Sequence, residues 1–421
     1  MAADVVIAAA EIEARLAGLD AVGRRPDGFH RLAWTAEDRA AAAWFAEQAA
    51  PIGLAVERDP AGNLWACPPT PPPWLAVGSH LDTVAAGGRW DGALGVACAF
   101  EVAAAADLPV AVISFADEEG ARYNTPTFGS RALVGRLDVA DALARADGDG
   151  VTMAEAMRAA GVDPARLAEA PQALARVSAF VEIHIDQSRE LAEAGAPIGV
   201  VSALAGRMRV AVEIDGEADH AGTTRRSERR DALAAAARLI VAAEELADDP
   251  RFVVTPTRLL VAPNALSTIP GAVRLWLDAR APEIEAVDAW RAALEERAAA
   301  LAAERRVEIG LATASRSAGV RFDGRVRAAL EEAAAASAGA DGTAPGAAPA
   351  PGAAPPPGAA PVPALTCFAG HDAGVLAERL PAGMVLVRNP SGVSHSPAET
   401  VDVADAAVAA TAVAAALERL R

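Results

Sequence analysis

Short apolar runs alternate with helix-length segments in the first half of the chain. WLAVGS at 74–79 and PVAVISFA at 109–116 predict strands, and the Ala-rich segment at 92–106 between them has the length of a helix. This strand, helix, strand order predicts a parallel α/β unit. A third strand is predicted at 180–185. Ligands of such sheets collect beyond the carboxyl ends of the strands, so we expect the chemistry just after 79 and 116.

From about residue 207 to 320 the pattern changes to alternating strands and long helices, which favours a separate, smaller α+β domain inserted into the first. Its predicted strands are RMRVAVEIDG, RFVVTPTRLLV and AVRLWLDAR, and its predicted helices span about 230–247 and 283–304. The predicted organisation is therefore a catalytic α/β domain in two parts, 1–206 and 321–421, around the inserted domain at 207–320.

A Pro/Ala/Gly-rich segment at about 339–363 interrupts the second part. Eight of the nineteen residues from 345 to 363 are proline. Proline ends helices and is excluded from central strands, so this segment is predicted to be a solvated loop or spacer.

Composition excludes several classes of function. The formal charge is −18, and all 38 cations are arginine, which argues against binding nucleic acid. Three scattered cysteines without a Cys-x-x-Cys pair indicate neither a disulfide framework nor a thiolate zinc site. No stretch of about 18 apolar residues lacks a charge, and Asp4 and Glu11 make the first segment unlike a secretory signal. We expect a cytoplasmic protein that acts on a small molecule.

Histidine and acidic residues follow the predicted strands. In GSHLDTVAAGGRWDG, His80 and Asp82 are two residues apart on extended chain, so both side chains point to one side. This arrangement suits a carboxylate that orients a metal-binding imidazole, with Asp91 as a further metal ligand.

The next strand ends in FADEEGARY, with Glu118 and Glu119 adjacent. Neighbouring side chains of an extended chain point in opposite directions, so one carboxylate can bind a metal while the other acts as a general base. Acidic pairs are common in solvated turns, and this motif alone favours that simpler interpretation.

The third strand contains VEIHIDQ, with His184 and Gln187, and GVSHSPAE near the C-terminus contains His395. A lone histidine is usually structural, but four separate segments that each supply His, Asp or Glu favour a metal site. Nitrogen and oxygen ligands without a thiolate suit zinc, manganese, cobalt or nickel.

Together these blocks resemble a known family. GSHLDTV, GGRWDGALGV, ADEEGARY with FGSRAL, HIDQ with PIGVVSALAG, DHAGTTRRSERRDAL, and GHDA with GVSHSPAE occur in family order from about 76 to 400. The chain resembles the hydantoinase/carbamoylase branch of the aminoacylase and carboxypeptidase metallohydrolases. The resemblance implies a zinc-peptidase-like catalytic domain with a dimerisation or lid domain, and hydrolysis of ureido or amide C–N bonds with two divalent metals.

The resemblance also implies roles for individual residues. Asp91 would bridge the two metals, with His80 and His184 at one metal and Glu119 and His395 at the other. Asp82 would orient His80. Glu118 would take a proton from the water between the metals and pass it to the leaving nitrogen.

The implied substrate contacts lie in three further blocks. His220 of the DHAGTT block would reach the active site of the partner subunit in a homodimer formed through 207–320. Arg280 would clamp the substrate carboxylate, for which a planar guanidinium is suited, and Gln187 would orient the ureido group. A surface cation on an edge strand is the simpler interpretation of Arg280.

Three departures from the family pattern affect substrate recognition. Ser267 stands where family members have the asparagine of Asn-Val-Ile-Pro-Gly, Arg225 and Arg226 replace Pro-Met after HAGTT, and 186–189 reads Asp-Gln-Ser-Arg instead of Glu-Gln-Gly-Pro. The implied metal ligands are complete, whereas the implied recognition residues have changed.

We therefore expect an N-carbamoyl-L-amino acid hydrolase. An allantoate amidohydrolase or a β-ureidopropionase is the first alternative, and an aminoacylase or dipeptidase is the second. A metal-binding homologue without activity is the alternative from another class.

Overall fold

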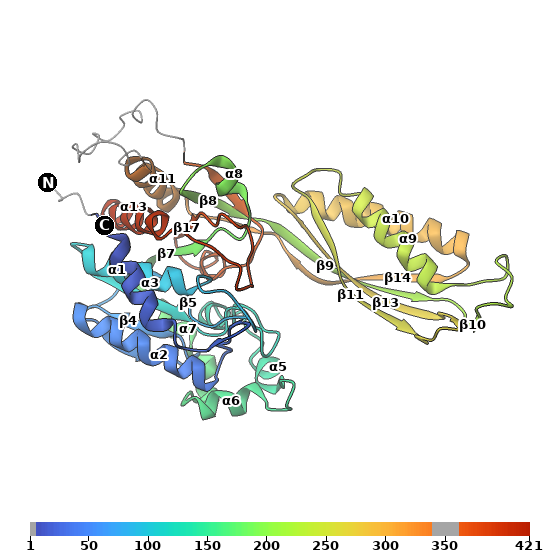
Figure 1. The fold of residues 1–421 in the computed structure, drawn as a ribbon, viewed down its shortest axis with the longest axis horizontal. Coiled ribbons are helices and arrows are strands. Elements are labelled where there is room, and N and C mark those ends of the chain that lie inside the picture. Colours follow the sequence, from blue (N-terminus) through green and yellow to red (C-terminus); the bar gives the residue numbers. More distant parts are fainter. Residues whose placement is uncertain (1–5, 339–361) are drawn as a thin grey trace. The chain divides into compact units, whose positions relative to one another are not determined.

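The computed structural model describes residues 6–338 and 362–421, so most of the predicted Pro/Ala/Gly-rich insertion lies outside the described residues. The described chain forms two compact units (Figure 1). The first contains the chain up to 202 together with 321–365 and 370–421, and the second contains 203–320 with 366–369.

A nine-stranded mixed sheet forms the centre of the first unit. The path runs β15-β8-β17-β7-β5-β6-β4-β3, with β16 beside β8, and the four central strands β17, β7, β5 and β6 are mutually parallel. The strands of this sheet are β3 (Ala55–Arg58), β4 (Leu64–Cys67), β5 (Trp74–His80), β6 (Val110–Phe115), β7 (Val177–Ile185), β8 (Ile198–Leu204), β15 (Val320–Arg321), β16 (Ala364–Cys367) and β17 (Ala382–Val387). A short hairpin pairs β1 (Arg24–Arg25) with β2 (Gly28–Phe29).

Helices flank this sheet. They are α1 (Ala9–Leu19), α2 (Ala36–Ala49), α3 (Ala93–Ala105), α4 (Phe128–Leu133), α5 (Val139–Ala144), α6 (Met153–Ala159), α7 (Pro171–Leu174), α8 (Glu190–Ala194), α11 (Gly324–Ala338), α12 (Asp372–Leu376) and α13 (Val403–Leu420). Short 3₁₀ turns occur at Ala50–Ile52 and Pro164–Glu169.

Helix α3 is the centre of the hydrophobic core. Its sequence, ALGVACAFEVAAA, is apolar on nearly every side because it packs between the sheet and the helices α1 and α13. A Cβ atom at Gly95 would lie 1.9 Å from the carbonyl oxygen of Ile183, so only glycine permits this close approach of α3 to β7. The close packing fixes the start of α3 beside the end of β7.

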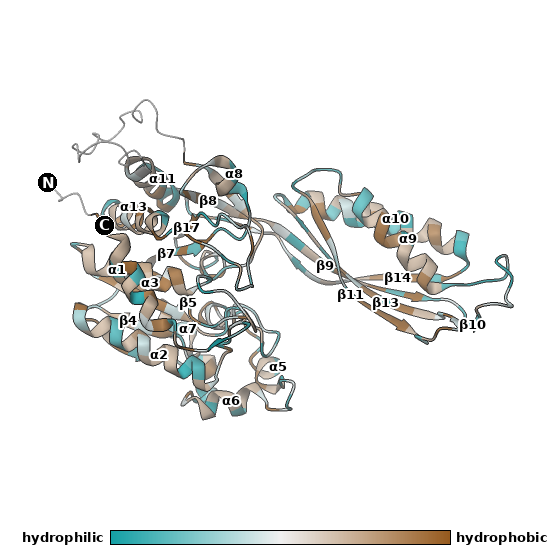
Figure 2. Cartoon of the chain, viewed as in Figure 1, coloured by the Kyte–Doolittle hydropathy of each residue, from teal (hydrophilic) through white to brown (hydrophobic). Residues whose placement is uncertain are grey.

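The second unit is a four-stranded antiparallel sheet with two helices on one face (Figure 1). Its order is β11-β13-β9-β14, and α9 (Ala232–Glu245) and α10 (Ile284–Arg305) cover it. The strands are β9 (Gly206–Asp215), β11 (Val253–Ala262), β13 (Ala272–Ala281) and β14 (Glu308–Ser317), and a separate pair joins β10 (Asp219–His220) to β12 (Thr268–Ile269). In β9 and β13, apolar residues toward the helices alternate with polar residues (Figure 2).

The predicted α/β class, the mixed and mostly parallel sheet flanked by helices, and the smaller α+β domain are confirmed. The sequence pattern did not identify β14, most of whose residues are exposed and whose large apolar side chains are Ile309 and Leu311.

Candidate metal centre

The predicted ligands come from neighbouring strands of the central sheet. His80 is the last residue of β5, His184 is the penultimate residue of β7, and Glu119 follows β6. Asp91 lies just before α3, and His395 lies between β17 and α13. Because β6, β5, β7 and β17 are adjacent and parallel, their carboxyl ends bring these segments to one edge of the sheet.

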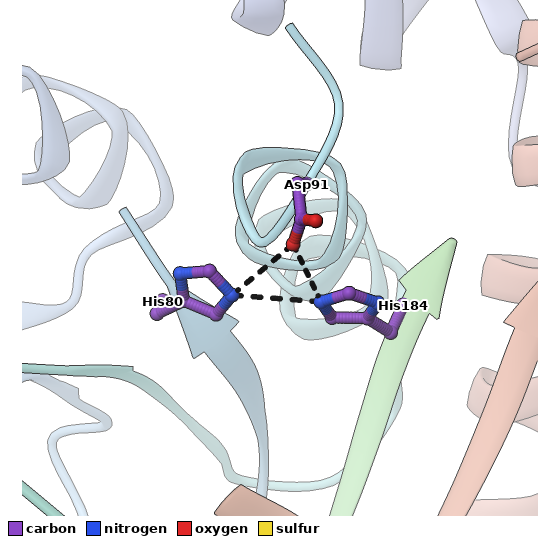
Figure 3. Close-up of side chains that lie close together, drawn as sticks. All are labelled: His80, Asp91 and His184. Carbon is purple, nitrogen blue, oxygen red and sulfur yellow. Dashed lines mark hydrogen bonds and ion pairs between the residues drawn. The ribbon is translucent and has the colours of Figure 1, made fainter. Parts of the chain in front are cut away.

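Three buried side chains form the first group of ligand atoms (Figure 3). Asp91 Oδ1 lies 3.0 Å from His184 Nε2 and 3.5 Å from His80 Nε2, and the two Nε2 atoms are 3.5 Å apart. Two atoms that each bind one zinc-sized ion at about 2.1 Å with a tetrahedral angle are about 3.4 Å apart. The spacing of these three atoms therefore fits a metal ion between them.

Backbone carbonyls orient both histidine rings. His80 Nδ1 lies 3.0 Å from the carbonyl oxygen of Asp82, and His184 Nδ1 lies 3.1 Å from that of Ile185. A carbonyl only accepts, so each Nδ1 carries a hydrogen, and Nε2 is the ring atom left to bind a metal ion. This is the tautomer that a metal ligand requires.

Gly92 lets the His80 ring lie against the start of α3. Its φ angle is +66°, and a Cβ atom here would lie 2.5 Å from the imidazole ring of His80. A side chain at this position would be strained and would displace a ligand.

The second oxygen of Asp91 faces another group. Asp91 Oδ2 lies 3.7 Å from His395 Nε2, which in turn lies 3.3 Å from Glu119 Oε2. Asp91 Oδ2 also accepts hydrogen bonds from Gln187 Nε2 and Ser394 Oγ, each at 3.0 Å. The two carboxylate oxygens of Asp91 are therefore directed at two separate sets of ligand atoms, as a bridging ligand requires.

The electrostatics favour positive charge between the ligands. Burial disfavours charge on His80, but the hydrogen bond to Asp91 and the charge of Glu118 raise its pKa well above the ordinary value. The pKa of His184 is raised in the same way against its burial, by Asp91 above all. The field that favours protons on these rings also favours divalent cations.

Glu118 and Glu119 have different surroundings. Burial, reinforced by Asp372 and Glu119, raises the pKa of Glu118 well above its usual range, although His80 opposes the shift. Burial and then Asp91 raise the pKa of Glu119 to about 8. Glu118 Oε2 lies 3.8 Å from His80 Nε2, so this carboxylate lies beside the first group of ligands.

Asp82 lies close to His80 through both its side chain and its backbone. The Asp82 carboxylate lies 3.7 Å from His80 Nδ1, beyond hydrogen-bond distance, and the backbone carbonyl of Asp82 accepts the hydrogen bond instead. The carboxylate is engaged elsewhere, because it accepts the backbone N–H groups of Glu118 and Glu119 at 3.1 Å each. Asp82 thus contacts both His80 and the loop that carries Glu118 and Glu119.

Two predicted recognition residues lie side by side in the second unit. His220 belongs to β10, and Ser267 precedes its partner strand β12 and accepts a hydrogen bond from Ala221 N. His220 Nδ1 accepts the backbone N–H groups of Gly222 and Thr223, each at 3.1 Å. The hydrogen of the neutral ring is therefore on Nε2, and this exposed histidine presents a donor.

Arg280 lies on β13 of the same unit, and it is held by its neighbours. Its Nε donates to Asp278 Oδ1 at 2.7 Å, and Nη1 donates to the carbonyl oxygen of Phe368. Arg209 of β9 donates to the other carboxylate oxygen of Asp278 at 2.9 Å. The guanidinium is 29% exposed, so it is oriented yet open to a ligand.

Sequence reasoning gave no role to three buried residues beside His184. The His371 ring packs edge-on against it with 4.5 Å between centroids, and His371 Nε2 has no partner among the described residues. Glu182 accepts Ala373 N at 2.7 Å and Ser79 Oγ at 3.0 Å, and Asp372 accepts Ser130 Oγ. The GHDA motif contains His371 and Asp372, and Glu182 lies within the VEIHIDQ motif.

The described part of the chain contains no helix that is both long enough and apolar enough to span a membrane.

Comparison with known proteins identifies the family. The model of peptidase family M20/M25/M40 matches residues 76–419, and the chain belongs to this family, in its hydantoinase/carbamoylase amidase branch. It is accordingly an amidohydrolase with candidate metal sites of the M20 type.

Two curated relatives and one solved structure illustrate the similarity. An N-carbamoyl-L-amino acid amidohydrolase of Geobacillus stearothermophilus is 38% identical over 408 residues, which is 94% of each chain. An allantoate amidohydrolase of Bacillus subtilis is 29% identical over 386 residues, 88% of each chain. The crystal structure of a hydantoinase/carbamoylase family amidase from Burkholderia multivorans superposes with a TM-score of 0.84 at 27% identity, covering 99% of both chains.

Proposed function

We propose that the protein hydrolyses the ureido C–N bond of N-carbamoyl-L-amino acids with the help of two divalent metal ions. The observation that carries the proposal is the two-sided environment of Asp91, with two imidazole Nε2 atoms at one oxygen and a further His/Glu pair near the other. The 38% identity with an N-carbamoyl-L-amino acid amidohydrolase over nearly the whole chain supports this substrate class.

His80 and His184 would hold one metal and Glu119 and His395 the other, with Asp91 shared by both. When bound, such ions polarise the substrate carbonyl, lower the pKa of water and stabilise negative charge on the carbonyl oxygen. The nitrogen and oxygen donors suit zinc, manganese, cobalt or nickel.

Glu118 is proposed as the general base and acid. Burial raises its pKa, and it lies beside His80 without belonging to either set of ligand atoms. It takes a proton from the water that attacks the ureido carbon, and a C–O bond forms. It then gives this proton to the leaving nitrogen as the C–N bond breaks.

Four residues are proposed to recognise the substrate. Arg280 binds the carboxylate, and the Nε2–H donor of His220 stabilises the negative charge on the carbonyl oxygen. Gln187 orients the ureido group from its position beside Asp91, and Ser267 lies next to His220. For this role, the Gln187 amide would release its hydrogen bond to Asp91 and form one to the substrate instead.

We also propose a homodimer formed through residues 207–320. Strand β11 is at the edge of its sheet and exposes Val253, Leu259 and Leu260 by 44–48% each. An edge strand with exposed apolar side chains and unpaired backbone groups is suited to pair with another chain.

Allantoate is the second candidate substrate, since allantoate amidohydrolases are also similar over most of the chain and Ser267 departs from the family pattern. Serine is shorter than asparagine and has a single donor, so the pocket would take a different group or a water. A β-ureidopropionase, an aminoacylase or dipeptidase, and a homologue without activity are further outcomes of the same test.

The test is a substrate panel assayed for ammonia and free amine. It contains N-carbamoyl-L-amino acids, β-ureidopropionate, allantoate and N-acyl amino acids, with the wild type and Glu118→Gln both loaded with metal. We expect turnover of the N-carbamoyl-L-amino acids, lowered by orders of magnitude in Glu118→Gln with metal content retained. Preference for another substrate class would reassign the specificity, and near-normal turnover of Glu118→Gln would reject its role in proton transfer.

A further inference from the structure

A small pocket lies behind the loop that carries Glu118 and Glu119. Its volume is about 20 Å³, and its lining includes Trp34, Asp38, Asp82 and Asp117. This volume is sufficient for one water molecule. None of these four residues is among the ligands proposed for the metals, although the Asp82 carboxylate accepts the backbone N–H groups of Glu118 and Glu119.

Two polar side chains that line the pocket have no hydrogen-bond partner among the described residues. Both carboxylate oxygens of Asp117 and the indole Nε1 of Trp34 are buried and unpaired. Asp117 is 2% exposed and Trp34 is 5% exposed, so bulk solvent does not satisfy them. Unpaired buried groups of this kind are rare in native proteins and indicate an ordered water or ion.

The two groups are complementary to water. An indole N–H only donates and a carboxyl oxygen can accept, whereas a water molecule does both. A metal cation would satisfy Asp117 but would meet the hydrogen of Trp34. The other acids in the lining already have partners: Asp38 accepts Trp34 N at 2.9 Å, and Asp82 accepts the N–H groups of the loop.

The backbone at Asp117 is strained, so further contacts are needed to hold the loop in this conformation. Asp117 has a φ angle of +50°, in the left-handed region, which costs a side-chain-bearing residue about 1–2 kcal/mol. Its carbonyl accepts Phe128 N at 3.1 Å, and the next carbonyl, of Glu118, accepts Thr127 N at 2.6 Å. Hydrogen bonds thus fix the backbone of this turn, and Asp117 also lines the pocket.

We propose that the pocket binds one ordered water molecule, which accepts a hydrogen bond from Trp34 and donates to Asp117. Through this water Asp117 and Trp34 act as positioning residues for Glu118. The water site follows from the pocket alone, and the positioning role rests on the proposed function of Glu118.

A crystal structure of the metal-loaded protein at a resolution that shows waters tests the site. We expect a water within about 2.7–3.2 Å of Trp34 Nε1 and of an Asp117 oxygen. An empty pocket, a direct bond between Trp34 and Asp117, or an ion bound at about 2.4 Å would overturn the proposal. This readout is independent of activity, so it decides the site even if no substrate of the panel is turned over.

Kinetics with matched variants test the positioning role. Trp34→Phe removes the donor and should lower kcat about tenfold with KM and metal content unchanged, as for other residues that orient a metal-site group through a partner. Trp44→Phe is the control, because it removes a buried indole N–H that donates to the carbonyl oxygen of Arg15, away from the loop. It should keep the wild-type kcat.

A second pair of variants covers the case in which Trp34→Phe does not fold. Asp117→Ala should lower kcat more than Asp117→Asn, since asparagine tolerates the left-handed backbone and keeps an acceptor for the water. Wild-type kcat in a variant that has lost the water, or equal losses in both Asp117 variants, would refute the positioning role.

Discussion

Replacement of Asp82 by asparagine tests whether this carboxylate holds the loop of Glu118 and Glu119 in place. The carboxylate accepts the two backbone N–H groups of the loop at 3.1 Å each, and it is 3% exposed. A hydrogen bond to a charged, buried acceptor contributes about 1.5–3 kcal/mol. Asparagine keeps one acceptor oxygen but turns an NH₂ group toward the second N–H, so one of the two bonds is lost.

The expected effect on kcat follows from that loss. About 2 kcal/mol of lost positioning corresponds to about a thirtyfold fall in kcat, and Asp82→Ala, which loses both bonds, should fall by about a thousandfold. Steady-state kinetics on the best substrate of the panel, with metal content measured in the same samples, provides both values. Because the backbone carbonyl of residue 82 still orients His80, metal should be retained in both variants.

Asp59→Asn is the matched control for this comparison. Asp59 is also a buried carboxylate that accepts backbone N–H groups, from Ala61 and Asn63, and its link to the loop of Glu118 is indirect, through the Asn63 side chain that accepts Ala116 N. Its variant should lower the thermal midpoint and retain kcat. If Asp82→Asn keeps full kcat with metal bound, or if Asp59→Asn loses as much activity, the positioning argument for Asp82 is wrong.

Three further predictions concern the metals, pH and assembly. Removal of metal by a chelator should abolish turnover, and manganese, cobalt, nickel or zinc should restore it; activity that persists in verified metal-free protein would contradict the mechanism. Despite burial, Arg280 and Arg209 lower the pKa of Asp278, so its stabilising contribution should be complete above its unfolded value of 3.8 and be lost as pH falls through the lower folded pKa. Thermal midpoints from pH 5 to 2 should therefore fall more steeply in the wild type than in Asp278→Asn, and parallel curves would exclude this contribution. Leu260→Glu should shift the mass measured by light scattering from dimer to monomer, whereas an unchanged dimer would place the interface elsewhere.

The proposed metal ligands could be selected from the sequence because each follows a local signal. His80 and His184 come from β-rich runs, and Glu119 follows another, so the rule that ligands collect at the carboxyl ends of parallel strands places them at one edge. The local pattern also predicted the approximate extents of the first strands. Whether these residues bind metal stays a prediction that metal analysis must test.

The residues that hold the proposed ligands in place could not be predicted from the sequence, because their contacts join distant parts of the chain. Glu399 accepts the backbone N–H groups of Trp90, Asp91 and His395, and its bond to Asp91 spans 308 positions. Trp34 lies in a helix-start segment whose pattern indicates only local structure. Nor did the sequence indicate that the Asp82 carboxylate accepts the backbone N–H of Glu118 in the loop after β6, 36 positions away.

The proposed metal ligands are buried, whereas the proposed substrate-recognition residues are more exposed. This difference explains where the sequence departs from the family pattern. His80, Asp91 and His184 are at most 4% exposed and are held by backbone carbonyls and a close helix, so most substitutions there would leave an unpaired buried group. The segments around Ser267 and Arg225, which are proposed to recognise the substrate, are exposed, and a substitution there changes stability by about 0.5 kcal/mol or less. Substrate preference can therefore change while the metal ligands remain complete. Differences in specificity from the carbamoylase relatives should accordingly follow exchanges at these exposed positions and leave metal content unaltered.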